Sequence, residues 1–345
     1  MVEQQFSAPL VLWQKEHGRH GLPWQGTRDT YRIWLSEIML QQTQVTTVIP
    51  YYLRFLERFP DLLSLAQAPL EVVLELWAGL GYYARARNLH RCAQAVVADF
   101  SGEFPKTPQL MSSLPGIGRS TAAAICVFSS GTRSAILDGN VKRVLARHFG
   151  IEGYPGAAQT EREMWALADS LLPESSIESY TQGLMDLGSL ICTRRNPFCG
   201  ICPLYDSCVA RQQGRQHLLP QARPKKVVPE RETSLLILTD GQRVLLERRP
   251  PVGIWGGLLS LPEGGVAEAR GLARRYACRL LGMQASAGLK HTFTHFHLHI
   301  QTLLCTLEVT HPLVAESGWE WVEFGAVETV ALPAPIRRLL RVALR

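Results

Sequence analysis

The pattern of apolar and polar positions is helical through the first two thirds of the chain. Between residues 31 and 38, apolar residues recur at i, i+3, i+4 and i+7, and Asp29 or Thr30 is placed to cap the helix that this spacing predicts. An Ala-rich run at 121–128 and an amphipathic run at 141–149 predict further helices. We therefore expect residues 1–212 to form a helical domain.

After residue 230 the pattern changes to short apolar runs bounded by turn residues. Ser234–Leu238 and Val244–Leu246 flank the dipeptide Asp240-Gly241, which predicts a β-hairpin. The rest of this part predicts an α+β domain. The remaining expected elements are a helix at 267–281, strands at 296–309 and 319–324, and a closing helix at 335–344.

Neither the helical spacing nor the strand-like pattern of apolar residues continues between these two parts. Residues 213–230 contain Pro220, Pro224 and Pro229 interleaved with basic side chains, which predicts an extended basic linker. A chain of 345 residues also suits two domains better than one. We expect a helical domain at 1–212, a linker at 213–230 and an α+β domain at 231–345.

Composition and charge exclude some classes of protein. An apolar content of 46% with 19% charged residues is typical of a folded globular protein. The start of the chain lacks a basic segment followed by an apolar one, and no apolar run reaches about 18 residues, so we expect a cytoplasmic protein without a membrane span.

The net charge of +6 lies entirely beyond residue 212, so it does not by itself indicate nucleic-acid binding. Local basic clusters are more informative, although a solvated helix face would look the same. These clusters are Arg85, Arg87 and Arg91; Lys142, Arg143 and Arg147; and Arg194 with Arg195.

The stretch Leu114-Pro115-Gly116-Ile117-Gly118 predicts a tight turn between two helices, because glycine permits backbone angles that other residues avoid. Unpaired N–H groups at the start of the second helix can bind one phosphate without reading a base. Asp138 follows Gly118 by twenty residues. A carboxylate near a bound phosphate suggests catalysis, but Asp138 is equally well placed as the N-cap of the helix at 141–149.

Four of the eight cysteines are clustered, with the spacing C-x6-C-x2-C-x5-C. Clustered thiols in a cytosolic chain more often bind metal than form disulfides. Zinc is the usual metal, but zinc sites commonly have a close cysteine pair at each end and here there is only one. The clustered residues are Cys192, Cys199, Cys202 and Cys208.

These motifs together resemble the helix-hairpin-helix DNA glycosylase superfamily and, within it, the MutY-type adenine DNA glycosylases. The resemblance rests on four blocks in the family's order: 35–44 (LSEIMLQQTQ), 79–87 (GLGYYARAR), the hairpin with 137–144 (LDGNVKRV), and the cysteines. It implies a monofunctional enzyme that flips adenine out of duplex DNA and hydrolyses its glycosidic bond where adenine is mispaired with 8-oxoguanine or guanine.

The resemblance also implies roles for individual residues. Glu37 adjoins the apolar stripe of its predicted helix and would be the general acid, although periodicity alone favours an ordinary exposed helix glutamate. Asp138 would face the sugar, and Asn140 would orient it. The implied DNA contacts are Gln42, Thr43, Leu80, Tyr82, Gly116, Gly118, Ser120, Lys142 and Arg143. Without the resemblance, Tyr82 would be interpreted as a core aromatic residue.

Strand cleavage is not expected, because bifunctional relatives carry a lysine at the position of Ser120 and a hydroxyl cannot form an imine. The four clustered cysteines would hold one four-iron four-sulfur cluster with an architectural role.

The α+β domain resembles the Nudix fold, but its helix has no acid between Glu268 and Gly282 to hold magnesium. The resemblance leaves this domain a role in recognising 8-oxoguanine through Phe293, Thr294 and His295, where Thr294 replaces the family's serine. The expected partner is double-stranded DNA, bound by a monomer. A thymine or pyrimidine glycosylase/lyase and a non-catalytic mismatch sensor are the alternatives.

Overall fold

The computed structural model describes residues 2–224, 228–250, 253–293, 295–310 and 318–344. The chain divides into two compact units. The first consists of Met1–Ala68 and Ala84–Lys225, and the second of Pro69–Tyr83 and Lys226–Arg345. The second unit thus includes a short segment that lies, in the sequence, within the helical part. The boundaries drawn from the sequence at 212 and 230 stay predictions.

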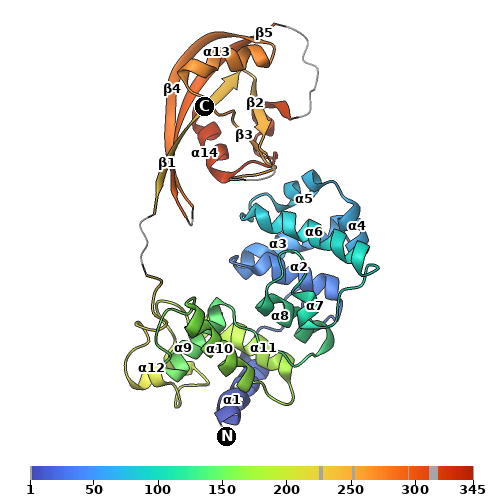
Figure 1. Ribbon diagram of the computed structural model, residues 1–345, viewed down its shortest axis with the longest axis vertical. Coiled ribbons are helices and arrows are strands. Elements are labelled where there is room, and N and C mark those ends of the chain that lie inside the picture. The colour runs from blue at the N-terminus through green and yellow to red at the C-terminus, as the bar shows by residue number, and fades with distance from the viewer. Residues whose placement is uncertain (1, 225–227, 251–252, 294, 311–317, 345) are drawn as a thin grey trace. The chain divides into compact units, whose positions relative to one another are not determined.

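The region up to residue 212 is helical, as expected (Figure 1). None of the described helices is long and apolar enough to cross a membrane. The helices are α1 (Val2–His17), α2 (Thr30–Leu40), α3 (Val45–Arg58), α4 (Leu62–Gln67), α5 (Leu70–Trp77), α6 (Tyr83–Asp99), α7 (Pro108–Met111), α8 (Arg119–Ser130), α9 (Gly139–Phe149), α10 (Ala158–Ser170), α11 (Ile177–Asp186) and α12 (Val209–Gln212), with the short segments η1 (Leu187–Ile191) and η2 (Cys199–Ile201).

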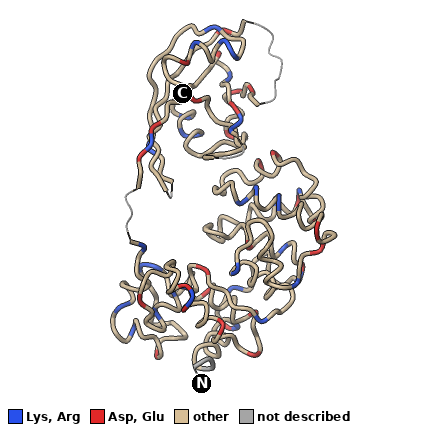
Figure 2. The backbone as a smooth tube through the Cα atoms, in the orientation of Figure 1, with Lys and Arg blue, Asp and Glu red and all other residues tan. Residues whose placement is uncertain are grey.

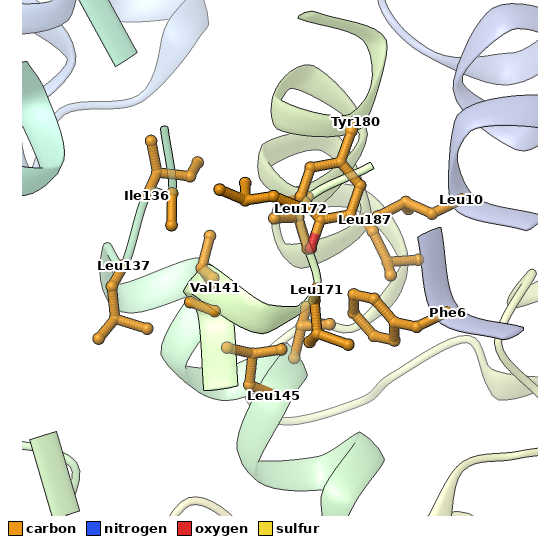
Figure 3. Packing of buried hydrophobic residues seen from close by; sticks show 14 of the residues in the cluster. Phe6, Leu10, Ile136, Leu137, Val141, Leu145, Leu171, Leu172, Tyr180 and Leu187 are labelled. Atoms are coloured by element: carbon orange, nitrogen blue, oxygen red, sulfur yellow. The ribbon is translucent and has the colours of Figure 1, made fainter. Parts of the chain in front are cut away.

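One core of the first unit forms around α9. Val141 and Leu145 of this helix are buried together with Phe6 and Leu10 of α1 and with Leu187, which follows α11 (Figure 3). Truncating a buried leucine in such a core typically costs about 2–5 kcal/mol of stability. The core therefore fixes the start of α9, where Asp138 lies.

Part of the predicted linker packs onto the first unit instead of extending away from it. Arg215 forms an ion pair of 2.5 Å with Glu152, and Arg147 donates a hydrogen bond of 2.9 Å to the backbone oxygen of Leu219, whose side chain is buried. The proline and charge pattern did not reveal these contacts, because their partners lie far away in sequence.

The second unit contains a six-stranded sheet in the order β3-β2-β1-β5-β4, with β6 paired to β2. β1 and β5 are parallel, from Glu230↔His297 to Thr239↔Thr306, and the predicted hairpin of β1 and β2 is present. The elements are β1 (Glu230–Thr239), β2 (Arg243–Arg248), β3 (Leu259–Ser260), α13 (Val266–Arg275), β4 (Cys278–Thr292), β5 (His297–Val309), β6 (Trp319–Glu323), η3 (Phe324–Ala326) and α14 (Ala334–Ala343).

Both faces of β1 are buried. Leu235 and Ile237 join the core that contains Ile336 and Leu339 of α14, whereas Leu236, on the opposite face, joins the core of α13. A strand buried on both faces explains why this sequence is continuously apolar instead of alternating.

The helix predicted at 267–281 is too long. α13 ends at Arg275, and β4 begins at Cys278. Ala277 between them has a φ of +53°, a left-handed conformation that stops a helix. The apolar residues that follow pair with β5, and this pairing cannot be read from local helical spacing.

Candidate active site

The first unit contains a cavity of about 590 Å3, and Glu37 of α2 forms part of its wall. Segments far apart in the sequence build this cavity: the end of α1, the loop that follows it, α2, and α11. Its polar lining includes Gln14, Lys15, Arg19, His20, Gln25, Arg28, Ser36, Glu178 and Gln182, and its apolar lining includes Leu22, Trp24, Ile33, Leu40, Val45, Phe128 and Met185.

α2 places Glu37 in this wall. The Asp29 side chain caps the helix by accepting a hydrogen bond of 2.9 Å from the Tyr31 backbone, and the predicted apolar stripe is buried. Glu37 itself is partly buried. Burial, followed by the nearby charge of Asp138, raises the pKa of Glu37 to about 8. This carboxyl is therefore largely protonated at neutral pH.

Asp138 is the N-cap of α9, as one of the two interpretations of the sequence predicted. Its Oδ1 accepts a hydrogen bond of 2.8 Å from the Val141 backbone. Burial raises the pKa of Asp138, while hydrogen bonds from Val141 and Asn140 and the charge of Arg143 oppose that effect. The backbone N–H of Val141 and the side-chain amide of Asn140 both donate to the Asp138 carboxylate, and such hydrogen bonds favour its ionised form.

Asn140 and Arg143 connect Asp138 to the segment before the cysteines. The Asn140 side chain donates to Asp138 Oδ2 at 3.4 Å, and Arg143 donates to the Gly188 oxygen at 2.6 Å and to the Cys192 oxygen at 2.8 Å. A Cβ on Gly188 would lie only 2.6 Å from the Asn140 Cβ, so glycine is required for this close packing.

Some side chains of the basic clusters contact other groups of the protein. Lys142 forms an ion pair of 2.6 Å with Glu161, and Arg147 is buried, donating to the backbone of Thr193 and Arg194. Basic and acidic residues are interleaved over both units (Figure 2). The alternative of a solvated helix face, which the sequence left open, is therefore wrong for Arg147, because sequence spacing does not show which carbonyls a guanidinium will meet.

The predicted hairpin joins α7 to α8. Gly116 has a φ of +80°, and a Cβ there would lie 2.8 Å from the Asn88 Cβ. Gly118 is the N-cap of α8, and a Cβ there would meet nothing within 4 Å among the described residues. The space outside Gly118 is therefore open to a ligand. Ser120 accepts a hydrogen bond of 2.9 Å from the Leu137 backbone, next to Asp138.

Gln42 and Tyr82 are both exposed and both have left-handed backbones, with φ of +58° and +50°. Such strain costs about 1–3 kcal/mol per residue and is concentrated at functional sites. Tyr82 is 53% exposed, which contradicts the interpretation of it as a core aromatic. Leu80 is only 6% exposed, so its entry into a duplex would require movement. Gln42 and Thr43 belong to the first unit, and Leu80 and Tyr82 to the second.

The four clustered cysteines surround one small cavity. The described residues nevertheless contain no group of three or more His, Cys, Asp or Glu side chains suited to a single metal ion. Four cysteine side chains around one cavity supply the all-thiolate ligand set that a four-iron four-sulfur cluster uses. Burial raises the pKa of the Cys202 thiol to about 12, and the other three cysteines add to this effect, so a positively charged cluster is needed to hold the sulfurs as thiolates.

Two of the lesion-recognition residues predicted in the second unit, Phe293 and His295, lie between β4 and β5. The Phe293 ring stacks on Phe296 at 4.7 Å and lies 5.9 Å from Trp255, and His295 meets Phe296 at 4.7 Å. Thr294 lies outside the described residues. Glu268 of α13 accepts a hydrogen bond of 2.8 Å from the Gly265 backbone and is thus a capping residue in this structure.

Sequence motifs gave no indication of most cavity residues. Asp186 is completely buried and accepts a hydrogen bond of 2.7 Å from Arg19 Nε and one of 2.8 Å from Gln182. These side chains fix one wall of the cavity. They come from distant segments without a repeated pattern, so only the tertiary structure brings them together.

Models of known families match three parts of the chain. The model of the HhH-GPD superfamily of base excision DNA repair proteins matches residues 35–170. The model of the iron-sulfur binding domain of endonuclease III matches 192–208, and that of the NUDIX domain matches 233–342. Together with the hairpin and the cavity, these matches define a base excision DNA glycosylase with an iron–sulfur module. Its cofactor is a four-iron four-sulfur cluster.

Individual proteins narrow this class. An adenine DNA glycosylase from Buchnera aphidicola subsp. Schizaphis graminum is 34% identical over 98% of both chains, and one from Homo sapiens is 31% identical over 98% of this chain and 73% of the relative. The chain belongs to the adenine DNA glycosylase family. The solved structure of a thermostable thymine-DNA glycosylase is also similar, with a TM-score of 0.56 and 28% identity, covering 61% of this chain and 97% of that one.

Proposed function

We propose that the protein hydrolyses the N-glycosidic bond of adenine mispaired with 8-oxoguanine or guanine in duplex DNA. The observation that carries this proposal is the Glu37 carboxyl in the cavity wall, with its pKa raised to about 8. A base inside a duplex is inaccessible, so the adenine must be flipped out to reach this carboxyl.

Glu37 supplies the proton that the reaction needs. Adenine is a poor leaving group as an anion, and the bond breaks readily only after a ring nitrogen, here N7, is protonated. An acid with a pKa near 8 carries that proton at neutral pH and can later activate the attacking water.

Asp138 supplies the fixed negative charge. As the bond breaks, positive charge develops on the deoxyribose, and an ionised carboxylate held by the start of α9 stabilises it. Asn140 orients this carboxylate through its side-chain amide. Both carboxyls therefore act on the same bond in different protonation states.

The hairpin grips the DNA backbone without reading its sequence. Gly116, Gly118 and Ser120 form the phosphate-binding turn, and the open space beside Gly118 supports this role. Gln42, Leu80 and Tyr82 insert around the place vacated by the flipped base, with the Tyr82 ring in place of a stacking neighbour. Thr43 lies near the opposite base. Lys142 and Arg143 also contact the DNA backbone.

Two further parts complete the proposal. Cys192, Cys199, Cys202 and Cys208 ligate the cluster, which shapes the loop that carries Arg194 and Arg195 toward the DNA. Phe293, Thr294 and His295 recognise 8-oxoguanine opposite the adenine. The ring contacts of Phe293 support this assignment, because they hold an aromatic side chain at the end of the β4–β5 hairpin.

Single-turnover assays with duplexes containing A:8-oxoguanine, A:G, A:C or thymine glycol test the proposal. We expect adenine release from the first two duplexes, an intact strand until alkali is added, and little trapping by borohydride, since Ser120 cannot form an imine. Release of the thymine lesion with strand cleavage would favour a thymine glycosylase/lyase; the similar solved structure is that of a thymine-DNA glycosylase. Binding without release would favour a mismatch sensor.

A further inference from the structure

Arg85 of α6 donates several hydrogen bonds to the segment that follows Glu37. One guanidinium nitrogen, Nη1, donates to the backbone oxygens of Ile38 at 3.2 Å and of Met39 at 2.9 Å, and also to that of Gln41. The other, Nη2, donates to Thr43 Oγ1 at 3.0 Å. Arg85 therefore satisfies carbonyls at the end of α2 and also binds a side chain beyond it.

These contacts lie on both sides of Gln42. Gln41 is bonded through its backbone oxygen to Arg85 and through its side chain to Thr121 of α8, at 3.4 Å. Thr43 is bonded through its hydroxyl to Arg85. Gln42 lies between these two anchored residues, is exposed, and has the left-handed φ of +58°. The anchors hold a backbone conformation that glutamine rarely adopts unaided.

We propose that Arg85 is a positioning residue that holds residues 41–43 so that the Gln42 side chain projects away from the protein, ready to enter the duplex. This inference rests on the proposed function, in which Gln42 fills the space of the flipped base. Arg85 lies in one of the basic clusters of the sequence, yet its guanidinium faces the protein backbone, so its main effect on DNA binding passes through Gln42.

The guanidinium geometry is essential to this role. A planar fork can reach the carbonyls of Ile38, Met39 and Gln41 with one nitrogen and the Thr43 hydroxyl with the other, whereas a lysine ammonium is a single point charge. Arg85→Lys should therefore behave more like Arg85→Met than like the wild type, although it keeps the positive charge.

Hydrogen–deuterium exchange of the DNA-free protein tests directly whether Arg85 holds residues 41–43 in place. Arg85→Met should increase exchange across residues 41–44, while Arg91→Met should not. Arg91 is a matched control, because it lies on the same helix and donates to the Asn88 side chain instead of to this loop. Unchanged exchange in Arg85→Met would overturn the proposal.

A double-mutant cycle tests the functional part, using a duplex with a non-hydrolysable adenine nucleotide opposite 8-oxoguanine. Arg85→Met should weaken binding at least about tenfold in the wild-type background but less than about twofold in Gln42→Ala, since the residue to be positioned is then missing. An equal loss in both backgrounds, or none in either, would refute the proposal. Failure of the wild type to release adenine would remove the proposed function and leave the exchange result intact.

Discussion

Arg143 donates a hydrogen bond of 2.8 Å to the side-chain oxygen of Asn140. The amide of Asn140 faces the Asp138 carboxylate on its other side, at 3.4 Å. Arg143 also holds the Cys192 and Gly188 backbone oxygens, so one side chain joins the cysteine loop to the carboxylate that we assign to the sugar. A change in that loop can therefore alter the orientation of Asp138.

The first prediction concerns this connection. Arg143→Lys should reduce single-turnover excision by about tenfold, because a lysine cannot reach the three oxygens together, while the Asp138 cap on Val141 remains. Excision rates at saturating enzyme measure the effect. Asn140→Ala should cause a similar loss, and the double variant should lose little more than either alone. Fully additive losses would show that the two residues act separately.

The second prediction concerns pH. Because burial and Asp138 raise the pKa of Glu37 to about 8, excision should fall as the pH rises through about 8. Glu37→Gln should lose excision by about two orders of magnitude or more and should show no such decline. Rates measured from pH 6 to 9.5 test both statements. A wild-type rate that stays constant across this range would remove Glu37 as the acid.

The same shift predicts a stability effect. A carboxyl whose folded pKa is raised favours the folded state most below its unfolded pKa, and this advantage is lost as the pH rises through the folded value. Glu37→Gln should therefore be more stable than the wild type at pH 8.5, by more than about 1 kcal/mol, since one pKa unit corresponds to roughly 1.4 kcal/mol. At pH 5 the difference should be small. Denaturant unfolding at the two pH values measures it.

The sequence predicted those parts of the site that depend on local backbone geometry. Asp29 and Asp138 were recognisable as helix caps, and both accept hydrogen bonds from the backbone of the helices they precede. The glycines of the hairpin were recognisable as well, since Gly116 has the positive φ that its tight turn requires. The helical and α+β classes of the two parts followed from the apolar spacing.

Internal partners of charged side chains could not be predicted. Arg85, Arg143 and Arg147 belong to basic clusters that the sequence left open as nucleic-acid contacts or solvated helix faces. Each instead donates to backbone oxygens that are distant along the chain. The strand β4 was mistaken in part for helix for a similar reason, because its pairing with β5 decides its conformation. The charge and apolar patterns describe one segment of the chain at a time. The arginine contacts and the β4–β5 pairing each depend on two segments that are distant in the sequence.

The fourth prediction concerns the cysteines. The purified protein should be brown and contain iron, and Cys199→Ser should lose iron and weaken DNA binding together, because the loop at 192–208 loses its shape. Metal analysis, absorption spectra and duplex binding measure these changes. Cys126→Ser is a suitable control, since Cys126 is a buried free thiol outside the loop. A colourless protein that contains zinc and is fully active would contradict the cluster assignment.

The last prediction separates the two roles of Asp138. Asparagine is about as good an N-cap as aspartate, so Asp138→Asn should keep the hydrogen bond to the Val141 backbone and retain nearly wild-type stability. Alanine cannot cap, so Asp138→Ala should lose about 0.5–2 kcal/mol of stability in denaturant unfolding.

Excision should respond differently from stability. Both variants lack the negative charge, and each should lose at least about two orders of magnitude in single-turnover rate, the usual scale for removing a preorganised charge. Both should still bind the mispair, because the hairpin and Gln42 are unchanged. If Asp138→Asn kept near-normal excision while Asp138→Ala lost it in proportion to its stability, capping would be the whole role of Asp138. The charge that stabilises the sugar would then have to come from another group near Glu37.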